Sequence, residues 1–304
     1  MPRTVIVIGG PTASGKSALA VGLAEFFGIE VIGADARQFY RDLPIGTGQP
    51  TDEERRGVPH HFIGHLDLDQ DMSAATYARE AIPVLHDLLD RHGRAIVVGG
   101  SGLYIDALLF ELDPLPPAQP KLRAELHALW KKEGLRPLQQ ELAHLDPGTF
   151  RTIDRNNPHR LIRAIEVCRT TGKPLSTQRT GRRPRADLDP VFITLDLPRS
   201  ELYARIDARV EAMIASGLEE EARHALSHRD RNALNTVGYK ELFAHFDGTI
   251  DRAAAIALIK QHTRNYAKRQ STWLRRDPHW HWMKPGGIDR AVALVEGHER
   301  DRSH

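Results

Sequence analysis

The chain has 304 residues, of which 40% are hydrophobic and 27% are charged, and its formal net charge is +2. This composition is ordinary for a globular protein, and the length suits about two domains or one domain with a large insertion. The single cysteine, Cys168, excludes an intramolecular disulfide and a zinc-cysteine cluster. No apolar run approaches the roughly 20 residues that cross a bilayer.

The first hundred residues alternate between strand and helix patterns. The run TVIVI at 4–8 is continuous, apolar and rich in β-branched residues, which predicts a buried parallel strand. Further predicted elements are a helix at 17–27 that ends at Gly28, a strand at 30–32, a helix at 74–91 and a strand at 95–98. This order predicts an α/β core with a parallel sheet, whose ligands bind at the carboxyl ends of the strands.

The composition changes at 111–120, where ELDPLPPAQP contains four prolines. The pattern is helical over 121–177, a basic loop broken by Gly and Pro follows at 179–190, and 191–195 is another strand candidate. We predict helices from there to the end. The chain is therefore expected to form a split core, 1–113 and 190–304, with a helical insertion domain at 114–189.

The stretch GPTASGKS follows the first strand and opens the first helix, with the spacing of a phosphate-binding loop. Its glycines let the backbone wrap an anion, its amides donate to phosphate oxygens, and Lys16 adds a positive charge. Ser17 could ligate Mg²⁺. The motif leaves open whether it holds a nucleoside triphosphate or a diphosphate substrate. The predicted phosphate ligands are Gly10, Pro11, Thr12, Ala13, Ser14, Gly15, Lys16 and Ser17.

Asp35 follows the second strand, at the strand end that faces this loop in the predicted sheet. A conventional ATPase or GTPase places an acid at the end of another strand to hold Mg²⁺. The candidate strand in AIVVGGSGLY ends in glycines and Ser101 instead. By position alone Asp35 is a metal ligand, a general base or a solvated loop residue.

Positive charge is concentrated in two places. Residues 151–200 carry eleven Lys and Arg against five Asp and Glu, and 262–276 carry five Lys and Arg with no acid. On the helix in the second segment, Arg264, Lys268 and Arg275 share one face, which suits phosphates. Ile259, Tyr266, Gln270 and Trp273 share the opposite face, which is expected to pack, although Tyr266 and Trp273 could stack on bases.

Six stretches taken in order resemble bacterial tRNA dimethylallyltransferases, also called isopentenyltransferases. They are GPTASGKS (10–17), ADARQFYRDLPIGTGQP (34–50), VPHHFIGH (58–65), VVGGSGLYIDALL (97–109), NNPHRLIRAIEV (156–167) and YAKRQSTWLRR (266–276). The resemblance implies transfer of a dimethylallyl group from dimethylallyl diphosphate to N6 of the adenosine 3′ to the anticodon. It also implies that the loop grips the donor's diphosphate without consuming ATP, and that the insertion covers the anticodon stem-loop of tRNA.

The resemblance assigns roles to individual residues. Asp35 would be the general base, Thr12 and Arg209 would act at the diphosphate, and Mg²⁺ would be the cofactor. Arg205, one turn before Arg209, is the other arginine considered there, and an ordinary surface ion pair is the alternative for both. The implied tRNA contacts are Asp35, Ala36, Arg37, Gln38, Ser101, Arg123, His159, Arg160, Leu161, Ile162 and Arg163, although Leu161 and Ile162 are expected to pack inward.

Three positions depart from the family pattern. Ala36 stands where a serine is usual, Gln49 where a lysine is common, and Ser17 where the loop usually has threonine. The first removes a hydroxyl near the base and the second removes a positive charge.

Several other features point away from further chemistry. His60, His61 and His65 do not form a helical metal site, because Pro59 and Gly64 interrupt the segment, and Cys168 is expected to be buried. We expect a monomeric cytoplasmic protein with no membrane partner. A small-molecule kinase and a non-catalytic RNA-binding protein are the competing interpretations.

Overall fold

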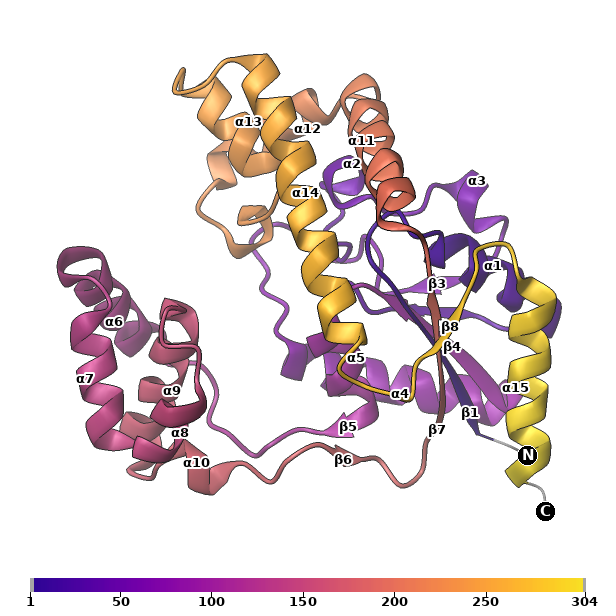
Figure 1. Cartoon of the computed structure of the whole chain (residues 1–304), viewed down its shortest axis with the longest axis horizontal. Coiled ribbons are helices and arrows are strands. Elements are labelled where there is room, and N and C mark those ends of the chain that lie inside the picture. The colour runs from indigo at the N-terminus through magenta and orange to yellow at the C-terminus, as the bar shows by residue number, and fades with distance from the viewer. Residues whose placement is uncertain (1–2, 303–304) are drawn as a thin grey trace. The chain divides into compact units, whose positions relative to one another are not determined.

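The computed structural model describes residues 3–302, and its core is a six-stranded sheet in the order β3-β2-β4-β1-β7-β8 (Figure 1). Every pairing in this sheet is parallel. The predicted α/β core with a parallel sheet is therefore confirmed. The strands are β1 Thr4–Gly9, β2 Val31–Gly33, β3 His60–His61, β4 Arg94–Gly99, β7 Asp189–Leu195 and β8 His281–Met283.

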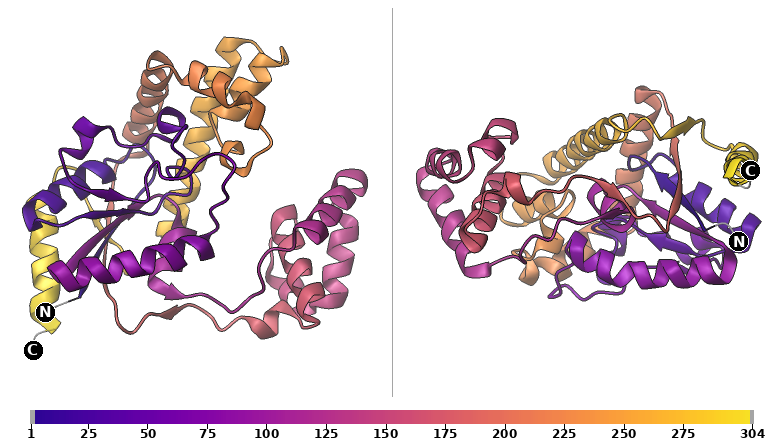
Figure 2. Two further views of the ribbon diagram at one scale, coloured as in Figure 1. Left: turned by 180° about the vertical axis from the view of Figure 1, so that it is seen from behind. Right: turned by 90° about the horizontal axis from the view of Figure 1, so that it is seen from below.

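Alternate residues of the central strand β1 pack into two separate hydrophobic clusters. Val5 and Val7 belong to one, with side chains of α4 (Ala74–His92) and α5 (Gly102–Leu109). Ile6 and Ile8 belong to the other, with side chains of α1 (Lys16–Phe27) and α15 (Ile288–Arg302). Because neighbouring side chains of a strand point to opposite faces, helices cover both faces of the sheet, as Figure 2 shows.

The prediction of helices alone after residue 195 is wrong, because β8 joins the sheet there. Ile193, Thr194 and Leu195 of β7 pair with the three residues of β8. In this strand His281 is exposed and Met283 is buried. A segment of only three residues is too short to show a strand-like hydrophobic pattern in the sequence.

Two further groups of helices follow β2 and β7 in the chain. Short helices after β2 are α2 (Pro44–Thr47) and α3 (Asp52–Arg55). The elements after β7 are α11 (Arg199–Ala215), α12 (Leu218–His224), the 3₁₀ turns η1 (Ala225–His228) and η2 (Asn232–Leu234), α13 (Tyr239–Phe246) and α14 (Arg252–Leu274).

Residues 111–183 form a second compact unit with its own core. Buried leucines of three helices meet there, among them Leu126, Leu142 and Leu161. Its helices are α6 (Pro120–Glu133), α7 (Arg136–Leu145), α8 (Pro147–Thr152), α9 (Pro158–Thr171) and α10 (Leu175–Gln178). A two-stranded sheet of β5 (Phe110–Glu111) and β6 (Arg183–Pro184) lies where the chain leaves and rejoins the main unit.

The predicted insertion, 114–189, begins three residues and ends six residues later than this unit. The chain is already part of the main unit by Arg185, whose amide donates to Leu109 O at 3.1 Å. Leu188 then packs into the cluster of α4 and α5. Across residues 3–302, the structure contains no helix long and apolar enough to cross a membrane.

Candidate active site

The loop between β1 and α1 has the backbone of an anion-binding turn. Ala13 and Gly15 have φ of 63° and 94°, and a Cβ on Gly10 would lie 2.7 Å from Ser14 Oγ. Glycine is therefore required where the chain reverses so tightly. Ser14 Oγ is buried and lacks a hydrogen-bond partner within residues 3–302. Thr12, Lys16 and Ser17 face a cavity at the start of α1.

The charge of Lys16 interacts with those of Asp35 and Arg209. Burial lowers the pKa of Lys16 from 10.5 to about 8, the attraction of Asp35 opposes this change, and the positive charge of Arg209 adds to it. Lys16, Arg209 and the Asp35 carboxylate thus share one cavity. Since an anionic ligand would relieve the repulsion between Lys16 and Arg209, the charges favour a polyanion.

Arg209 reaches this cavity from α11, the position that the resemblance implies. Its Nη2 donates to Gly48 O at 3.2 Å, and a Cβ on Gly48 would lie 1.7 Å from the same nitrogen. Gly48, at φ 61°, therefore makes room for the guanidinium. Arg205 pairs with Glu201 at 2.7 Å, and its Nη1 lies 4.0 Å from the position of a Cβ on Gly15, so this arginine also lies beside the phosphate loop. Arg205 thus forms the expected ion pair at the surface and still reaches the neighbourhood of the phosphate loop.

Asp35 lies at the carboxyl end of β2 and is fixed by its neighbours. Its Oδ1 accepts from the Arg37 amide at 3.1 Å, and the Ala36 amide donates to Ser101 Oγ at 3.0 Å. Tyr266 from α14 also hydrogen-bonds the Ser101 side chain, and burial together with the charge of Asp35 raises the pKa of Tyr266 to about 12. Ser101 thus links the backbone next to Asp35 to Tyr266 of α14.

The two residues after Ala36 line the cavity while bonding to the backbone. Arg37 donates to Asn232 O at 2.5 Å and Asn235 O at 3.2 Å, and Gln38 Nε2 donates to Gly48 O at 2.7 Å. Their side chains therefore fasten the Asp35 loop to the η2 segment and to α2.

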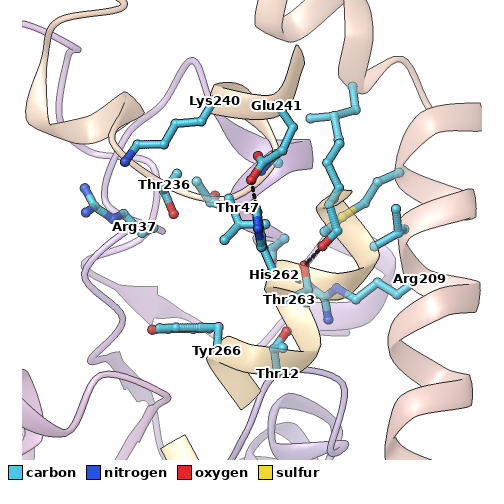
Figure 3. A pocket seen from close by; sticks show the side chains of 18 of the residues that line it. Thr12, Arg37, Thr47, Arg209, Thr236, Lys240, Glu241, His262, Thr263 and Tyr266 are labelled. Atoms are coloured by element: carbon cyan, nitrogen blue, oxygen red, sulfur yellow. Dashed lines mark hydrogen bonds and ion pairs between the residues drawn. The ribbon is translucent and has the colours of Figure 1, made fainter. Parts of the chain in front are cut away.

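The cavity has a volume of about 770 Å³ and is lined by residues of the main unit alone. Figure 3 shows Thr12, Tyr266 and Arg209 around one end, with His262, Glu241 and Lys240 at the other. Apolar side chains complete the wall, among them Val210, Met213, Leu218 and Ile259. The cavity thus joins an anion-binding end to an apolar wall, with the Asp35 carboxylate also in its lining.

Comparison with known proteins decides the family. A family model described as IPP transferase matches residues 38–277. The chain belongs to the IPP transferase family. The phosphate loop lies outside the residues that this family model matches.

Relatives of the family match over nearly the whole chain. The tRNA dimethylallyltransferase of Cytophaga hutchinsonii is 46% identical over 294 residues, which cover 97% of each protein. The tRNA dimethylallyltransferase of Christiangramia forsetii is 44% identical, covering 93% of this chain and 94% of that relative. Membership of this family makes the chain an enzyme of the prenyl transferase class, and a kinase is not favoured.

Solved structures of the family share the fold. The full-length tRNA isopentenylpyrophosphate transferase of Bacillus halodurans superposes with a TM-score of 0.71 at 33% identity, covering 99% of this chain and 100% of that one. A eukaryotic dimethylallyltransferase described as acting on tRNA superposes with a TM-score of 0.81 at 25% identity. That match covers 98% of this chain and 80% of the eukaryotic one.

Gln270 is a residue of the IPP transferase site that sequence reasoning assigned to packing. Its Oε1 accepts from the Thr12 amide at 3.0 Å, and its Nε2 donates to Gly100 O at 2.8 Å. It is buried, with 6% of its surface exposed. It therefore ties the phosphate loop to the loop after β4. The only local sign was its place on the same helix face as Tyr266.

Glu221 was also missed. Its carboxylate accepts from the amides of Ile45 and Gly46, both at 2.7 Å, and from Tyr239 Oη at 2.6 Å. A Cβ on Gly46 would lie 2.4 Å from that hydroxyl. Glu221 thus holds α2, and with it the chain leading to Gly48, in place. Nothing distinguishes it in the acidic run Glu219–Glu221.

In the unit 111–183 the structure separates the predicted RNA contacts into two groups. His159 and Arg160 are exposed. Arg123 and Arg163 both donate to the buried carboxylate of Glu166 at 2.7 Å. These two arginines therefore stabilise the fold of the unit, a role that the sequence alone did not reveal.

Two other residues of this unit that were predicted to contact RNA have no exposed side chain. The side chains of Leu161 and Ile162 are buried in its hydrophobic core, with exposures of 0% and 1%. These two side chains therefore offer no surface to an RNA. The expectation that they pack inward is confirmed.

The predicted basic stripe on α14 is partly neutralised. Arg264 pairs with Asp207 of α11 at 2.5 Å, and the Arg275 guanidinium lies 4.8 Å from the centre of the Trp282 ring. Lys268 remains exposed. On the other face, Trp273 packs beside Trp280, with ring centres 5.9 Å apart, so packing rather than base stacking is correct for Trp273.

The remaining polar candidates carry no metal site. His60 and His61 form β3, and His61 Nε2 lies 2.7 Å from Glu30 Oε2. Residues 3–302 contain no group of three or more His, Cys, Asp or Glu side chains that could hold a metal ion. Cys168 is buried, as expected.

The Ser17 hydroxyl suits a Mg²⁺ ion whose other ligands are mainly water and the phosphates of the enzyme's substrate. Its side chain lines the cavity next to Lys16. Mg²⁺ typically keeps several waters and takes one or two protein oxygens together with substrate phosphates. A single hydroxyl beside an anion site meets that requirement without a cluster of acids.

Proposed function

We propose that this enzyme transfers the dimethylallyl group of dimethylallyl diphosphate to N6 of the adenosine adjacent to the anticodon on its 3′ side in tRNA. The products are N6-dimethylallyladenosine and diphosphate. One observation carries the proposal: Lys16 and Arg209 share a single cavity with the Asp35 carboxylate. Membership of the IPP transferase family gives that combination its chemical meaning.

The donor would bind with its diphosphate on the loop 10–17 and its hydrocarbon tail on the apolar wall. Arg209 and Met213 are one helical turn apart on α11, and both would contact a Cβ placed on Gly48. Met213 Cε lies 3.3 Å from that position. The guanidinium and an apolar surface are thus adjacent, which matches the boundary between diphosphate and tail in the donor.

Departure of the diphosphate requires neutralisation of its developing negative charge. Lys16, Arg209 and the amides at the start of α1 supply positive charge that is fixed before the reaction. The Thr12 amide would not bind the diphosphate, because it already donates to Gln270. The Thr12 side chain is therefore the group of this residue that would contact the anion. Mg²⁺ at Ser17 would add charge to the same phosphates when bound.

The adenine amine would attack as the donor bond breaks. The C1–O bond of the donor breaks, its electron pair leaves with the diphosphate, and N6 forms the new bond to C1. One N6 proton then passes to the Asp35 carboxylate, since Oδ1 is held by the Arg37 amide and the side chain borders the cavity. The base must first leave its stack, which costs least in an unpaired loop.

A direct assay separates this function from the kinase alternative. Unmodified tRNA is incubated with the full-length protein and either dimethylallyl diphosphate or ATP, each with Mg²⁺. We expect a mass gain of one prenyl unit on a single adenosine with the first donor and no nucleotide turnover with the second. ATP hydrolysis or phosphorylation without prenylation would reject the proposal.

A further inference from the structure

Tyr266 is a side chain of the cavity to which the proposed function gives no role. It comes from α14, is partly buried and lines the cavity together with Asp35. Figure 3 shows its ring extending away from α14, with the hydroxyl on the same side of the cavity as Arg37. The Arg269 guanidinium lies 5.6 Å from the centre of the ring and helps to hold it in place.

The position of Tyr266 on α14 is one helical turn from the anion-binding end of the cavity. Gln270, four residues later on the same helix face, accepts from the Thr12 amide of the phosphate loop. Four residues of helix span about 6 Å along its axis. The charge of Asp35 acts on the phenol and helps burial to raise its pKa, so the hydroxyl stays protonated at neutral pH. Tyr266 therefore lies beside the carboxylate that would take the N6 proton, where the reacting base must bind.

The hydroxyls of Ser101 and Tyr266 have one proton more than their bonds to the protein use. Ser101 Oγ accepts from the Ala36 amide at 3.0 Å, and the two hydroxyls hydrogen-bond each other. Neither of them donates to a further protein acceptor in the described part of the chain. If Ser101 donates to Tyr266, each oxygen both accepts and donates, and such a chain polarises its last O–H group. That last group is the phenol of Tyr266, which borders the cavity.

The other polar groups next to Asp35 in the sequence already donate to the protein. The Arg37 amide donates to Asp35 Oδ1 at 3.1 Å, and the Arg37 guanidinium donates to carbonyl oxygens of the η2 segment. Gln38 Nε2 donates to the backbone at the end of α2 at 2.7 Å. Ala36 has no polar side chain. The phenol of Tyr266 is therefore a donor beside Asp35 that remains available to a base.

We propose that Tyr266 recognises the target adenine by donating a hydrogen bond to the ring nitrogen next to its amine. The proposal rests on the proposed function and adds to the same site a residue that determines base specificity. Adenine presents the N6–H donor beside an acceptor, which is N1 on one edge and N7 on the other. Asp35 would accept from N6 while Tyr266 donates to the neighbouring nitrogen. Guanine would instead turn its O6 acceptor toward the carboxylate, so that two acceptors would face each other.

The test combines one change in the enzyme with one changed atom in the substrate. The full-length wild type and Tyr266→Phe act on anticodon stem-loops whose target nucleoside is adenosine, 1-deazaadenosine or 7-deazaadenosine. Each analogue replaces one ring nitrogen by C–H and keeps the amine. With the wild type we expect kcat/KM to fall roughly tenfold for one analogue, which identifies the nitrogen that is bound. Tyr266→Phe should be about tenfold slower on adenosine and should no longer distinguish adenosine from that analogue.

Tyr77→Phe is the matched control for loss of a phenol hydroxyl. The hydroxyl of Tyr77 is buried in the main unit, has no hydrogen-bond partner within residues 3–302 and does not line the cavity. This variant should keep the wild-type kcat/KM with all three stem-loops. Because both changes keep the aromatic ring, thermal unfolding of the two variants should stay close to that of the wild type.

Three outcomes would overturn the recognition of adenine by Tyr266. The first is equal kcat/KM of the wild type with all three stem-loops, and the second is an analogue effect of the same size in Tyr266→Phe, which a purely structural role would give. The third is an analogue effect that persists in Tyr266→Phe and disappears in Ser101→Ala, which would assign the contact to Ser101. If the wild type prenylates no RNA, the proposed function fails and this proposal fails with it, whereas the three outcomes above leave that function standing.

Discussion

Replacing Gln270 by glutamate should convert the enzyme into one that is active at low pH and weak at high pH. The side chain joins two loops: it accepts from the Thr12 amide at 3.0 Å and donates to Gly100 O at 2.8 Å. A neutral carboxylic acid can reproduce both bonds, since its carbonyl accepts and its hydroxyl donates. A carboxylate cannot donate, so it would face the Gly100 carbonyl with a second acceptor.

The size of the effect follows from the burial of this group. Gln270 is 6% exposed, so the Gly100 carbonyl gains little from water when its donor is lost. An unsatisfied buried acceptor costs about 1–3 kcal/mol. If this penalty appears in full as a higher activation free energy, because the phosphate loop is displaced, the rate falls by roughly 5- to 150-fold. Burial also raises the pKa of the introduced carboxyl group, which moves the loss toward neutral pH.

The assay is the initial rate of prenylation at saturating donor and tRNA between pH 5.5 and 8.5. The ratio of Gln270→Glu to wild type at each pH removes the titration of groups that both proteins share. We expect this ratio to approach one at the acid end and to fall as pH rises. Gln270→Leu, which can make neither bond, should be slow at every pH, and Gln261→Glu on the exposed face of α14 should match the wild type. A ratio independent of pH would refute the assigned role of Gln270.

Three further predictions concern charges in and around the site. Asp35→Ala should lower the rate of prenylation by about 10²–10⁴-fold while tRNA affinity stays within a few fold, and loss of RNA binding instead would remove its role as a base. Because burial lowers the pKa of Lys16 to about 8, the free site loses its proton as pH rises through 8. An anion restores that pKa, so binding of inorganic diphosphate should weaken above pH 8 with proton uptake by calorimetry, and Lys16→Met should abolish the uptake. Glu166→Gln should destabilise residues 111–183 by about 1–3 kcal/mol, because Arg123 and Arg163 lose their buried carboxylate, and unchanged hydrogen exchange in that segment would contradict this.

The elements that could be predicted from sequence are those whose pattern is local. The apolar run at 4–8 becomes β1, with every residue from Thr4 to Gly9 buried. Gly28 ends α1 in the left-handed conformation, as its position after Phe27 indicates. Both signals arise within a few residues and do not depend on the rest of the fold.

The features that could not be predicted depend on contacts between residues that are far apart in the chain. β8 is a strand because it aligns with β7, about ninety residues earlier by direct count from the sequence. From its helix face Arg264 was predicted to bind phosphate, but in the structure it pairs with Asp207, 57 residues earlier in the chain. Spacing on one helix cannot reveal a partner on another.

The phosphate loop shows how little a local motif decides by itself. The residues 10–17 form an anion site that a kinase could also use. What distinguishes this cavity comes from elements more than 180 residues later: Arg209 on α11, and Tyr266 and Gln270 on α14. Gln270 occupies an amide of the loop that a triphosphate could otherwise contact, and Tyr266 holds the serine that positions Asp35. The second half of the core thus supplies the side chains that surround a general anion site, and substitutions of cavity residues on α14 should alter donor selectivity more than substitutions in the strands of the sheet.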